Sequence, residues 1–312
     1  MTDLIEKITE NIKKVIIGQD RTISLVLTAL ISGGHVLIED LPGTGKTVLA
    51  KSLARSVSAE FKRIQFTPDL LPSDVTGINY YSQSASSFIF RKGPAFCNIL
   101  LADEINRAAP RTQSCLLECM AENQITVDNN TYKLSKPFFV IATENPIETL
   151  GTYPLPEAQL DRFLMRISME NPSKEEELLL LKRFESDEPL ESLEPVCTTE
   201  DINILCRAVK NVYVHPQLAD YIVSLSQMSR SMANVEAGIS PRGTLALMNA
   251  SRAYAALNGR DYLVPEDIKV VAVPVLSHRI SVSGSVNSVK EQEQIIENLL
   301  KSVPVPTEKW TK

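Results

Sequence analysis

A glycine-rich loop is the most chemically specific feature of the sequence. The run LPGTGKT (residues 41–47) follows the apolar segment His35 to Glu39 and opens a helical pattern that continues through Leu53. In this context backbone N–H groups converge on phosphate oxygens at a helix N-terminus. Asp40 replaces the first glycine of the G-x-x-x-x-G-K-[ST] pattern, but aspartate still tolerates a tight turn. The sequence therefore predicts a phosphate-binding loop.

The loop also predicts individual roles for its side chains. Lys46 would reach the β- and γ-phosphates, and Thr47 would ligate Mg²⁺. An ordinary glycine-rich loop is the alternative, but the order of strand, loop and helix favours phosphate binding. The predicted nucleotide-binding residues of this segment are Pro42, Gly43, Thr44, Gly45, Lys46, Thr47 and Val48.

Two adjacent carboxylates end a second apolar segment, Asn98 to Asp103. Asp103 would hold the magnesium shell, and Glu104 would orient the attacking water. Two acids at a strand end are otherwise a common solvated terminus. The phosphate loop upstream makes the functional interpretation of this pair more specific.

A polar amide follows a third apolar segment, Phe138 to Thr143. The carboxyl ends of parallel strands meet at one edge of a sheet, so Asn145 would face the phosphates. Asn145 is therefore the candidate γ-phosphate sensor. Asparagine before proline is also a good turn former, which is the simpler alternative.

The elements that must position these residues alternate between helix and strand. Apolar residues recur at helical spacing through Leu4 to Val15 and Ile23 to Leu30, and Gly33 would end the second helix. The three apolar segments that follow are typical of strands buried on both faces. This alternation predicts an α/β fold with a parallel sheet covered on both faces.

Two β-hairpins interrupt that alternation. A segment rich in Pro, Gly and Ser carries short β-like pieces at 79–82 and 87–91. Two further pieces, 124–127 and 131–134, flank the turn sequence DNN (residues 128–130). Both hairpins could project from the sheet.

The pattern changes to helices only after Ile167. Capping boxes at Ser173 and Thr198, and a first-turn proline at Pro265, mark helix starts. We therefore expect an α/β nucleotide-binding domain with two hairpin insertions at residues 1–170, and a smaller all-helical lid domain at residues 171–312.

Composition excludes several classes of protein. The chain of 312 residues is 44% hydrophobic, yet its apolar runs are far shorter than the roughly 20 residues of a membrane span. The mixed-charge N-terminus does not match a secretion signal, so we expect a cytoplasmic protein. Five cysteines, an odd number, favour free thiols. The net charge of −6 offers no bulk attraction for nucleic acid.

Beyond these motifs, the chain resembles AAA+ ATPases, specifically the MoxR group, over nearly its whole length. The resemblance rests on IIGQ (residues 16–19), on DEINRA (103–108) and above all on GTYPLPEAQLDRF (151–163). The two hairpin segments match the two insertions that this branch of AAA+ proteins carries. The resemblance thus implies a P-loop AAA+ domain followed by a helical lid.

The resemblance also implies an ATPase ring, expected to be hexameric, in which ATP lies between neighbouring subunits. Arg162 matches the arginine that completes the site of the next subunit, and Asn145 matches the first sensor. Arg242 matches the second sensor. Ile16 and Ile17 match the lining of the adenine pocket, and we group Gly18 with them as nucleotide-binding.

Physical reasoning supports Arg242 independently. Ser240 looks like an N-cap and Pro241 a first-turn residue, so Arg242 places a cation at the positive end of a helix dipole. An anionic partner would resolve that conflict. Arg162, judged without the family, could be a surface ion-pair residue with Asp161.

MoxR-like ATPases resemble chaperones that remodel or activate a protein partner, often one with a von Willebrand A-type metal-binding domain. This chain contains no Asp-x-Ser-x-Ser motif of such a domain, so the partner would be a separate polypeptide. We therefore expect Mg-ATP hydrolysis that drives chaperone-like remodelling. Alternatives are the motor subunit of a metal chelatase and a nucleic-acid motor. The hairpin tip, with only Lys133 and Lys136 on its arms, disfavours nucleic acid.

Overall fold

A parallel sheet forms the centre of the molecule. The computed structural model describes residues 2–39, 43–145, 151–183, 189–282 and 288–306. Five strands lie in the order β2-β5-β8-β1-β9, and all neighbours run parallel. Their bounds are β1 (Val36–Glu39), β2 (Phe61–Gln65), β5 (Ile99–Asp103), β8 (Phe139–Glu144) and β9 (Met165–Ile167). The predicted parallel α/β fold is confirmed, with the three predicted strands at its centre.

The two edge strands have no counterpart in the sequence-based prediction, for different reasons. Strand β2 carries exposed Lys62, Arg63 and Gln65, so it lacks the continuous apolar pattern of a central strand. Strand β9 has three residues, which is too short for periodicity to be read.

The sheet separates two hydrophobic cores because side chains alternate between its faces. Leu37 belongs to one core, whereas Val36 and Ile38 belong to the other. The second core also contains buried residues of α1 (Thr2–Lys13), α2 (Asp20–Ser32) and α3 (Lys46–Ser56). Gly33 ends α2 in the left-handed conformation, at φ 73°, as the sequence predicts.

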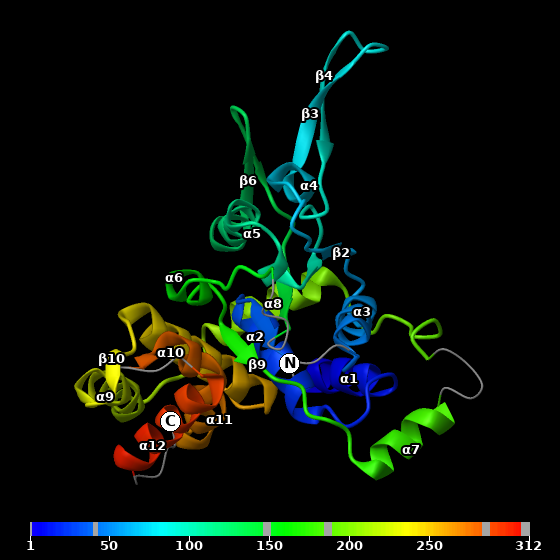
Figure 1. Cartoon of the computed structure of the whole chain (residues 1–312). Helices are drawn as coiled ribbons and strands as arrows, with labels where there is room; N and C mark the ends of the chain where they lie inside the picture. Colours follow the sequence, from blue (N-terminus) through cyan, green and yellow to red (C-terminus); the bar gives the residue numbers. More distant parts are fainter. Residues whose placement is uncertain (1, 40–42, 146–150, 184–188, 283–287, 307–312) are drawn as a thin grey trace.

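Both predicted hairpins are present, and they project together from one side of the sheet (Figure 1). The first is β3 (Gly77–Ser82) with β4 (Ser87–Lys92), preceded by the short helix α4 (Pro72–Thr76). The second is β6 (Gln124–Val127) with β7 (Asn130–Lys133), preceded by α5 (Pro110–Glu122).

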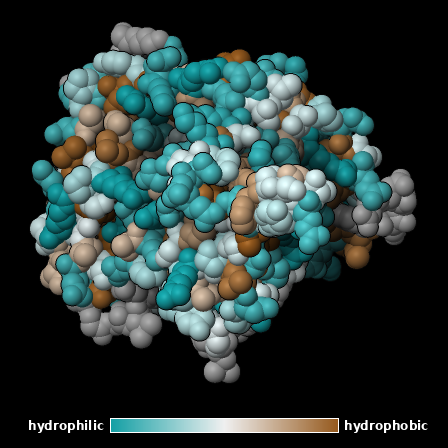
Figure 2. Space-filling view, turned by 90° about the horizontal axis from the view of Figure 1, so that it is seen from above, coloured by the Kyte–Doolittle hydropathy of each residue, from teal (hydrophilic) through white to brown (hydrophobic). Residues whose placement is uncertain are grey.

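The two hairpins are joined side by side. Asn79 Nδ2 donates to Asp128 Oδ2 at 2.6 Å, and the rings of Phe90 and Tyr132 stack with centroids 4.4 Å apart. The surface seen from this side is mostly hydrophilic with scattered apolar residues (Figure 2). Phe88 on β4 is 73% exposed, so the first hairpin presents apolar side chains to its surroundings.

Helices dominate the chain after β9. They are α7 (Lys174–Arg183), α8 (Thr199–Val209), α9 (Pro216–Ser231), α10 (Pro241–Leu257), α11 (Pro265–Leu276) and α12 (Val289–Ser302). The expected capping boxes at Ser173 and Thr198 form, and Pro265 begins α11. The expectation of helices alone after Ile167 needs one correction. Strands β10 (Val235–Ala237) and β11 (Ser281–Val282) pair antiparallel, and both are too short to leave a sequence pattern.

The helical region packs directly onto the sheet domain. Helix α2 contacts both α8 and α10, and buried residues of these helices belong to the core on the Val36 face of the sheet. Hydrophobic packing is therefore continuous across residue 170, and the division of the chain there stays a proposal based on the change in pattern. Among the described helices, none is long and apolar enough to cross a membrane.

Candidate active site

A cavity of about 410 Å³ lies at the carboxyl edge of the sheet. It brings the glycine-rich loop together with the ends of β2, β5 and β8. Its lining residues are Gly43, Thr44, Gly45, Lys46, Thr47, Val48, Arg63, Gln65, Asp103, Glu104, Thr143, Glu144 and Asn145. Pro42 and Asp40 lie outside the described residues. The phosphate loop, the two acids and Asn145 thus meet in one place.

Two glycines give the loop its shape. Gly43 and Gly45 each have φ of 91°, a conformation that L side chains rarely adopt. Gly45 caps α3, and its carbonyl accepts the N–H of Leu49 at 2.9 Å. The N-terminus of α3 therefore lines the cavity, where its N–H groups and the helix dipole favour an anion.

Thr143 ties the two acids together. Its hydroxyl donates to Asp103 Oδ1 at 2.6 Å and accepts the backbone N–H of Glu104 at 2.8 Å. Arg63 Nη2 donates to Asp103 Oδ2 at 2.6 Å. A carboxylate and the Thr47 hydroxyl facing one cavity are oxygen donors of the kind that Mg²⁺ prefers, together with water and phosphate oxygens. The donor set therefore fits a magnesium ion.

Glu104 stands in a strained conformation. Its φ is 56°, in the left-handed region that residues other than glycine seldom occupy. Its Oε2 accepts hydrogen bonds from Gln65 Nε2 at 2.8 Å and from Arg107 Nη1 at 3.0 Å. Because two donors fix this carboxylate at the rim of the cavity, its orientation is set before any nucleotide arrives.

A second carboxylate pair lies at the carboxyl ends of β1 and β8. Glu39 and Glu144 are register partners on β1 and β8, and Arg166 Nη1 lies 3.8 Å from Glu39 Oε1. Burial, reinforced by the neighbouring Glu39 and opposed by Arg166, raises the pKa of Glu144 to about 8. Burial also raises the pKa of Glu39. At neutral pH, Glu144 therefore favours the protonated form.

The cavity contains residues that sequence reasoning missed, namely Arg63, Gln65, Thr143 and Glu144. Arg63 and Gln65 alternate along β2, so they share one face at the carboxyl end of an edge strand. That spacing of two polar residues just before Phe66 was the available signal.

Arg162 and Arg242 meet in a different place, a pocket of about 290 Å³. Its lining includes His35, which precedes β1, and Leu164, which precedes β9, so this pocket lies at the amino edge of the sheet. A strand as short as β1 spans about 13 Å. The two arginines therefore lie at the amino edge of the sheet, whereas the phosphate loop lies at the opposite, carboxyl edge.

The contacts of the two arginines differ. Arg162 Nη1 donates to the carbonyl of Leu117 at 2.8 Å. Arg242 Nε lies 3.5 Å from Asp161 Oδ2, at the N-terminus of α10, where Ser240 caps the helix as expected. Arg279 also binds Asp161, with Nε donating to Oδ1 at 2.7 Å. The carboxylate expected next to Arg162 thus holds two other arginines.

The predicted adenine-binding residues lie apart from the cavity lining. Ile16 is buried in the core, and Ile17 is half-buried. Gly18 has φ of 70°, and the carboxyl group of Glu176 lies where a side chain at Gly18 would begin. The role of these three residues stays a prediction.

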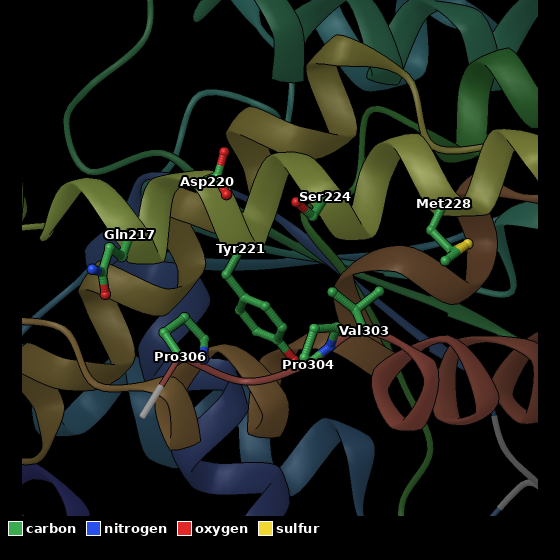
Figure 3. Close-up of a pocket in the computed structure, with 8 residues that line it drawn as sticks. All are labelled: Gln217, Asp220, Tyr221, Ser224, Met228, Val303, Pro304 and Pro306. Carbon is green, nitrogen blue, oxygen red and sulfur yellow. The ribbon is translucent and has the colours of Figure 1, made fainter. Parts of the chain in front are cut away.

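A third hollow, of about 400 Å³, lies far along the chain from these motifs (Figure 3). Side chains of α9 form one wall, and Val303, Pro304 and Pro306 form the other. Tyr221 points across it from α9 toward Pro304. None of the residues predicted to bind nucleotide lines it, so we assign the chemistry to the first two sites.

Comparison with known proteins identifies matches to two family models. Residues 35–165 match the model of the ATPase family associated with various cellular activities (AAA), and residues 227–299 match the AAA lid domain. A solved structure from Cytophaga hutchinsonii, provisionally assigned as an ATPase, has a TM-score of 0.90 and 38% identity. That likeness covers 98% of this chain and 96% of the other.

Relatives in other bacteria are similar over nearly the full chain. The uncharacterized protein YeaC of Bacillus subtilis is 48% identical, covering 98% of this chain and 96% of the relative. Chaperone MoxR1 of Mycobacterium tuberculosis is 39% identical, covering 97% and 82%. Protein MoxR of Methylorubrum extorquens is 31% identical, covering 97% and 96%.

Proposed function

The chain belongs to the MoxR-type AAA+ ATPases, and from that premise we propose that it hydrolyses Mg-ATP to remodel or activate a protein partner. The observation that carries the proposal is the single cavity in which Lys46 and Thr47 meet Asp103 and Glu104. A phosphate-binding loop opposite two strand-end acids is the arrangement that ATP hydrolysis needs.

Each residue has a distinct task in this proposal. Lys46 and the N-terminus of α3 bind the β- and γ-phosphates, and Thr47 and Asp103 hold the metal. When bound, Mg²⁺ supplies positive charge that neutralises the phosphate oxygens. Glu104 orients the attacking water and accepts its proton. Asn145 follows β8 and is 7% exposed, and its side-chain amide N–H donates a hydrogen bond to the γ-phosphate.

Arg162 and Arg242 would act between subunits. Both line the amino-edge pocket, so they serve a nucleotide bound at the carboxyl edge of an adjacent copy. This requirement favours a homo-oligomeric ring, which we propose to be a hexamer with an ATP at each interface. An arginine supplied by a neighbour stabilises charge on the transferring phosphoryl group.

The partner is proposed to be a protein client, or a protein with a von Willebrand A-type domain on a separate chain, that meets this protein in the cytoplasm. Support comes from the relative named a chaperone and from the apolar side chains exposed on the first hairpin. The turn of the second hairpin carries the carboxylate of Asp128, and its negative charge disfavours contact with phosphate backbones. The metal-chelatase motor remains the alternative within the same fold.

Glu104→Gln tests the hydrolytic assignment. The amide keeps the shape and the hydrogen bond from Gln65 but cannot accept a proton, so ATP should still bind while hydrolysis slows by about 10² to 10⁴-fold. Calorimetry with Mg-ATP and a phosphate-release assay measure the two quantities. A variant that hydrolyses ATP at the wild-type rate would remove Glu104 from the mechanism.

A further inference from the structure

One carboxylate at the amino edge binds two arginines of the lid. Asp161 Oδ1 accepts from Arg279 Nε at 2.7 Å, and Oδ2 lies 3.5 Å from Arg242 Nε. Arg279 belongs to the 3₁₀ turn η2 (Ser277–Arg279), and Arg242 to the first turn of α10. Asp161 itself follows the short helix α6 (Glu157–Leu160) and immediately precedes Arg162. Asp161 therefore connects the lid to the segment that carries Arg162.

Arg279 fixes the backbone on both sides of Arg162. Its side chain is 3% exposed and donates to the carbonyls of Phe163 at 2.7 Å and Leu164 at 3.1 Å. It also donates to the carbonyls of Asp161 and Val275. A buried cation must have its donors satisfied, so this set of bonds constrains the geometry of residues 161–164.

Arg242 differs from Arg279 in burial, and that difference separates their roles. The Arg242 side chain is 56% exposed, so its long pair with Asp161 contributes little to folding stability. It nevertheless lines the same pocket as Arg162. A cation at a helix N-terminus, such as Arg242, is unfavourable unless a carboxylate or another anion lies close.

The charge of the pocket points to an anion. Its described lining includes three guanidinium groups, of Arg162, Arg242 and Arg279, against the single carboxylate of Asp161. Leu245, on the same rim, is 56% exposed, which suits a surface that another copy of the chain covers. The remaining positive charge would be met by phosphate oxygens.

We propose that Asp161 and Arg279 are positioning residues that hold Arg162 and Arg242 as a preset two-armed clamp for the phosphates of ATP on the neighbouring subunit. This inference rests on the proposed function. Preset donors cost no reorganisation when charge develops during the reaction, whereas a misplacement of about 1 Å can cost about 10²-fold in rate. Asp161 thus acts through the two arginines and does not itself touch the nucleotide.

Asp161→Asn is the direct test in the full-length protein. The amide is isosteric but lacks the charge that orients Arg242 and Arg279, so kcat for ATP should fall about 10²-fold while KM stays within about threefold. The affinity of a dilute subunit for Mg-ATP should also stay unchanged, because its own phosphate cavity lies at the opposite edge. If Asp161 only attached the lid to the sheet domain, its substitution would lower thermal stability without a selective fall in kcat.

Mixing experiments supply the sharper readout. Asp161→Asn mixed with Lys46→Ala should recover activity, because an intact clamp then meets an intact loop at some interfaces. Asp161→Asn mixed with Arg162→Ala should not recover, since both subunits lack a working clamp. An unfolded subunit would rescue neither mixture. The matched control is Glu200→Gln, which removes an exposed carboxylate paired with Arg207 at 2.8 Å and should keep wild-type kcat.

Two outcomes separate the inference from the proposed function. If Arg162→Ala and Lys46→Ala fail to complement each other, the shared site itself is wrong. If they complement while Asp161→Asn retains full kcat, the positioning role is overturned. Should Asp161→Asn fail to fold, Asp161→Glu keeps the charge for Arg279 but displaces Arg242. A loss of about tenfold in kcat then supports the proposal, and wild-type kcat contradicts it.

Discussion

The two edges of the sheet carry opposite chemistry. The carboxyl-edge cavity joins one lysine of the loop to two strand-end acids, whereas the amino-edge pocket gathers three arginines around one aspartate. Among the described residues, neither is a complete site for phosphoryl transfer: Arg63 of the first is paired with Asp103, and the second has neither a phosphate loop nor a metal-binding pair. The difference is consistent with the proposal that one chain holds the two halves of a site that neighbouring copies complete.

The largest expected effect comes from breaking the amino-edge half. Arg162→Ala should lower the rate of ATP hydrolysis by about 10³ to 10⁵-fold, as for arginines supplied by a partner. Nucleotide binding to an isolated subunit should survive, because the Arg162 guanidinium lies in the other pocket. A phosphate-release assay beside equilibrium binding measures both. Full ATPase activity in this variant, or in a protein that stays monomeric, would contradict the proposal that neighbouring subunits share each site.

Breaking the carboxyl-edge half should give the converse result. Lys46→Ala removes the cation that meets the phosphates, which should weaken Mg-ATP binding by about 2 to 5 kcal/mol in the variant's own cavity. Calorimetry on the dilute subunit measures this loss. Its amino-edge pocket should remain intact, so the variant should still complement Arg162→Ala. Unchanged affinity would refute the assignment of Lys46.

The smallest expected effect is on the pH dependence of folding stability. It distinguishes the carboxyl edge from the amino edge, because Glu144 is a carboxyl group buried at the carboxyl edge. Its pKa of about 8 lies above the usual glutamate value, so the folded state holds a proton that the unfolded state has lost. Stability from this group is therefore present at low pH and falls as pH rises from about 4.5 to about 8.

Glu144→Gln should remove that dependence, since the amide never ionises. At pH 8 the variant should be about 1 to 3 kcal/mol more stable to unfolding than the wild type, and at pH 5 nearly equal to it. Urea denaturation at the two pH values measures the difference. Glu191→Gln, an exposed glutamate, is the control and should change neither curve. Parallel curves for Glu144→Gln and wild type would show that Glu144 is ionised in the folded protein.

The sequence predicted the centre of the fold because central strands carry their signal locally. Strands β5, β8 and β1 are continuous apolar runs, and the ends of such strands locate Asp103, Glu104 and Asn145 without further information. Gln65 could not be found in this way, since β2 alternates with exposed polar residues. Its hydrogen bond to Glu104 joins residues 39 apart in the chain, and the spacing of apolar residues within one segment cannot predict such a contact.

The position of the arginines was still harder to predict. Ser240 and Pro241 indicate the helix start at Arg242, but the direction in which that helix approaches the sheet depends on packing between α10 and α2. Likewise, the bond between Asp161 and Arg279 spans 118 residues. The helix start thus identified Arg242 and the family resemblance identified Arg162, whereas the opposite edges of the sheet on which the predicted site residues lie follow only from tertiary packing. Their catalytic roles stay predictions.

Helix α5 connects the candidate active site to the joined hairpins. Helix α5 starts a few residues after Glu104 and ends in the second hairpin, and its Leu117 carbonyl holds Arg162. The stacked rings of Phe90 and Tyr132 join the first hairpin to the second. If α5 tilts when the proposed neighbouring site hydrolyses ATP, the two joined hairpins would move together with it. A small tilt of α5 would then become a larger displacement at the hairpin tips, where the proposed partner could bind.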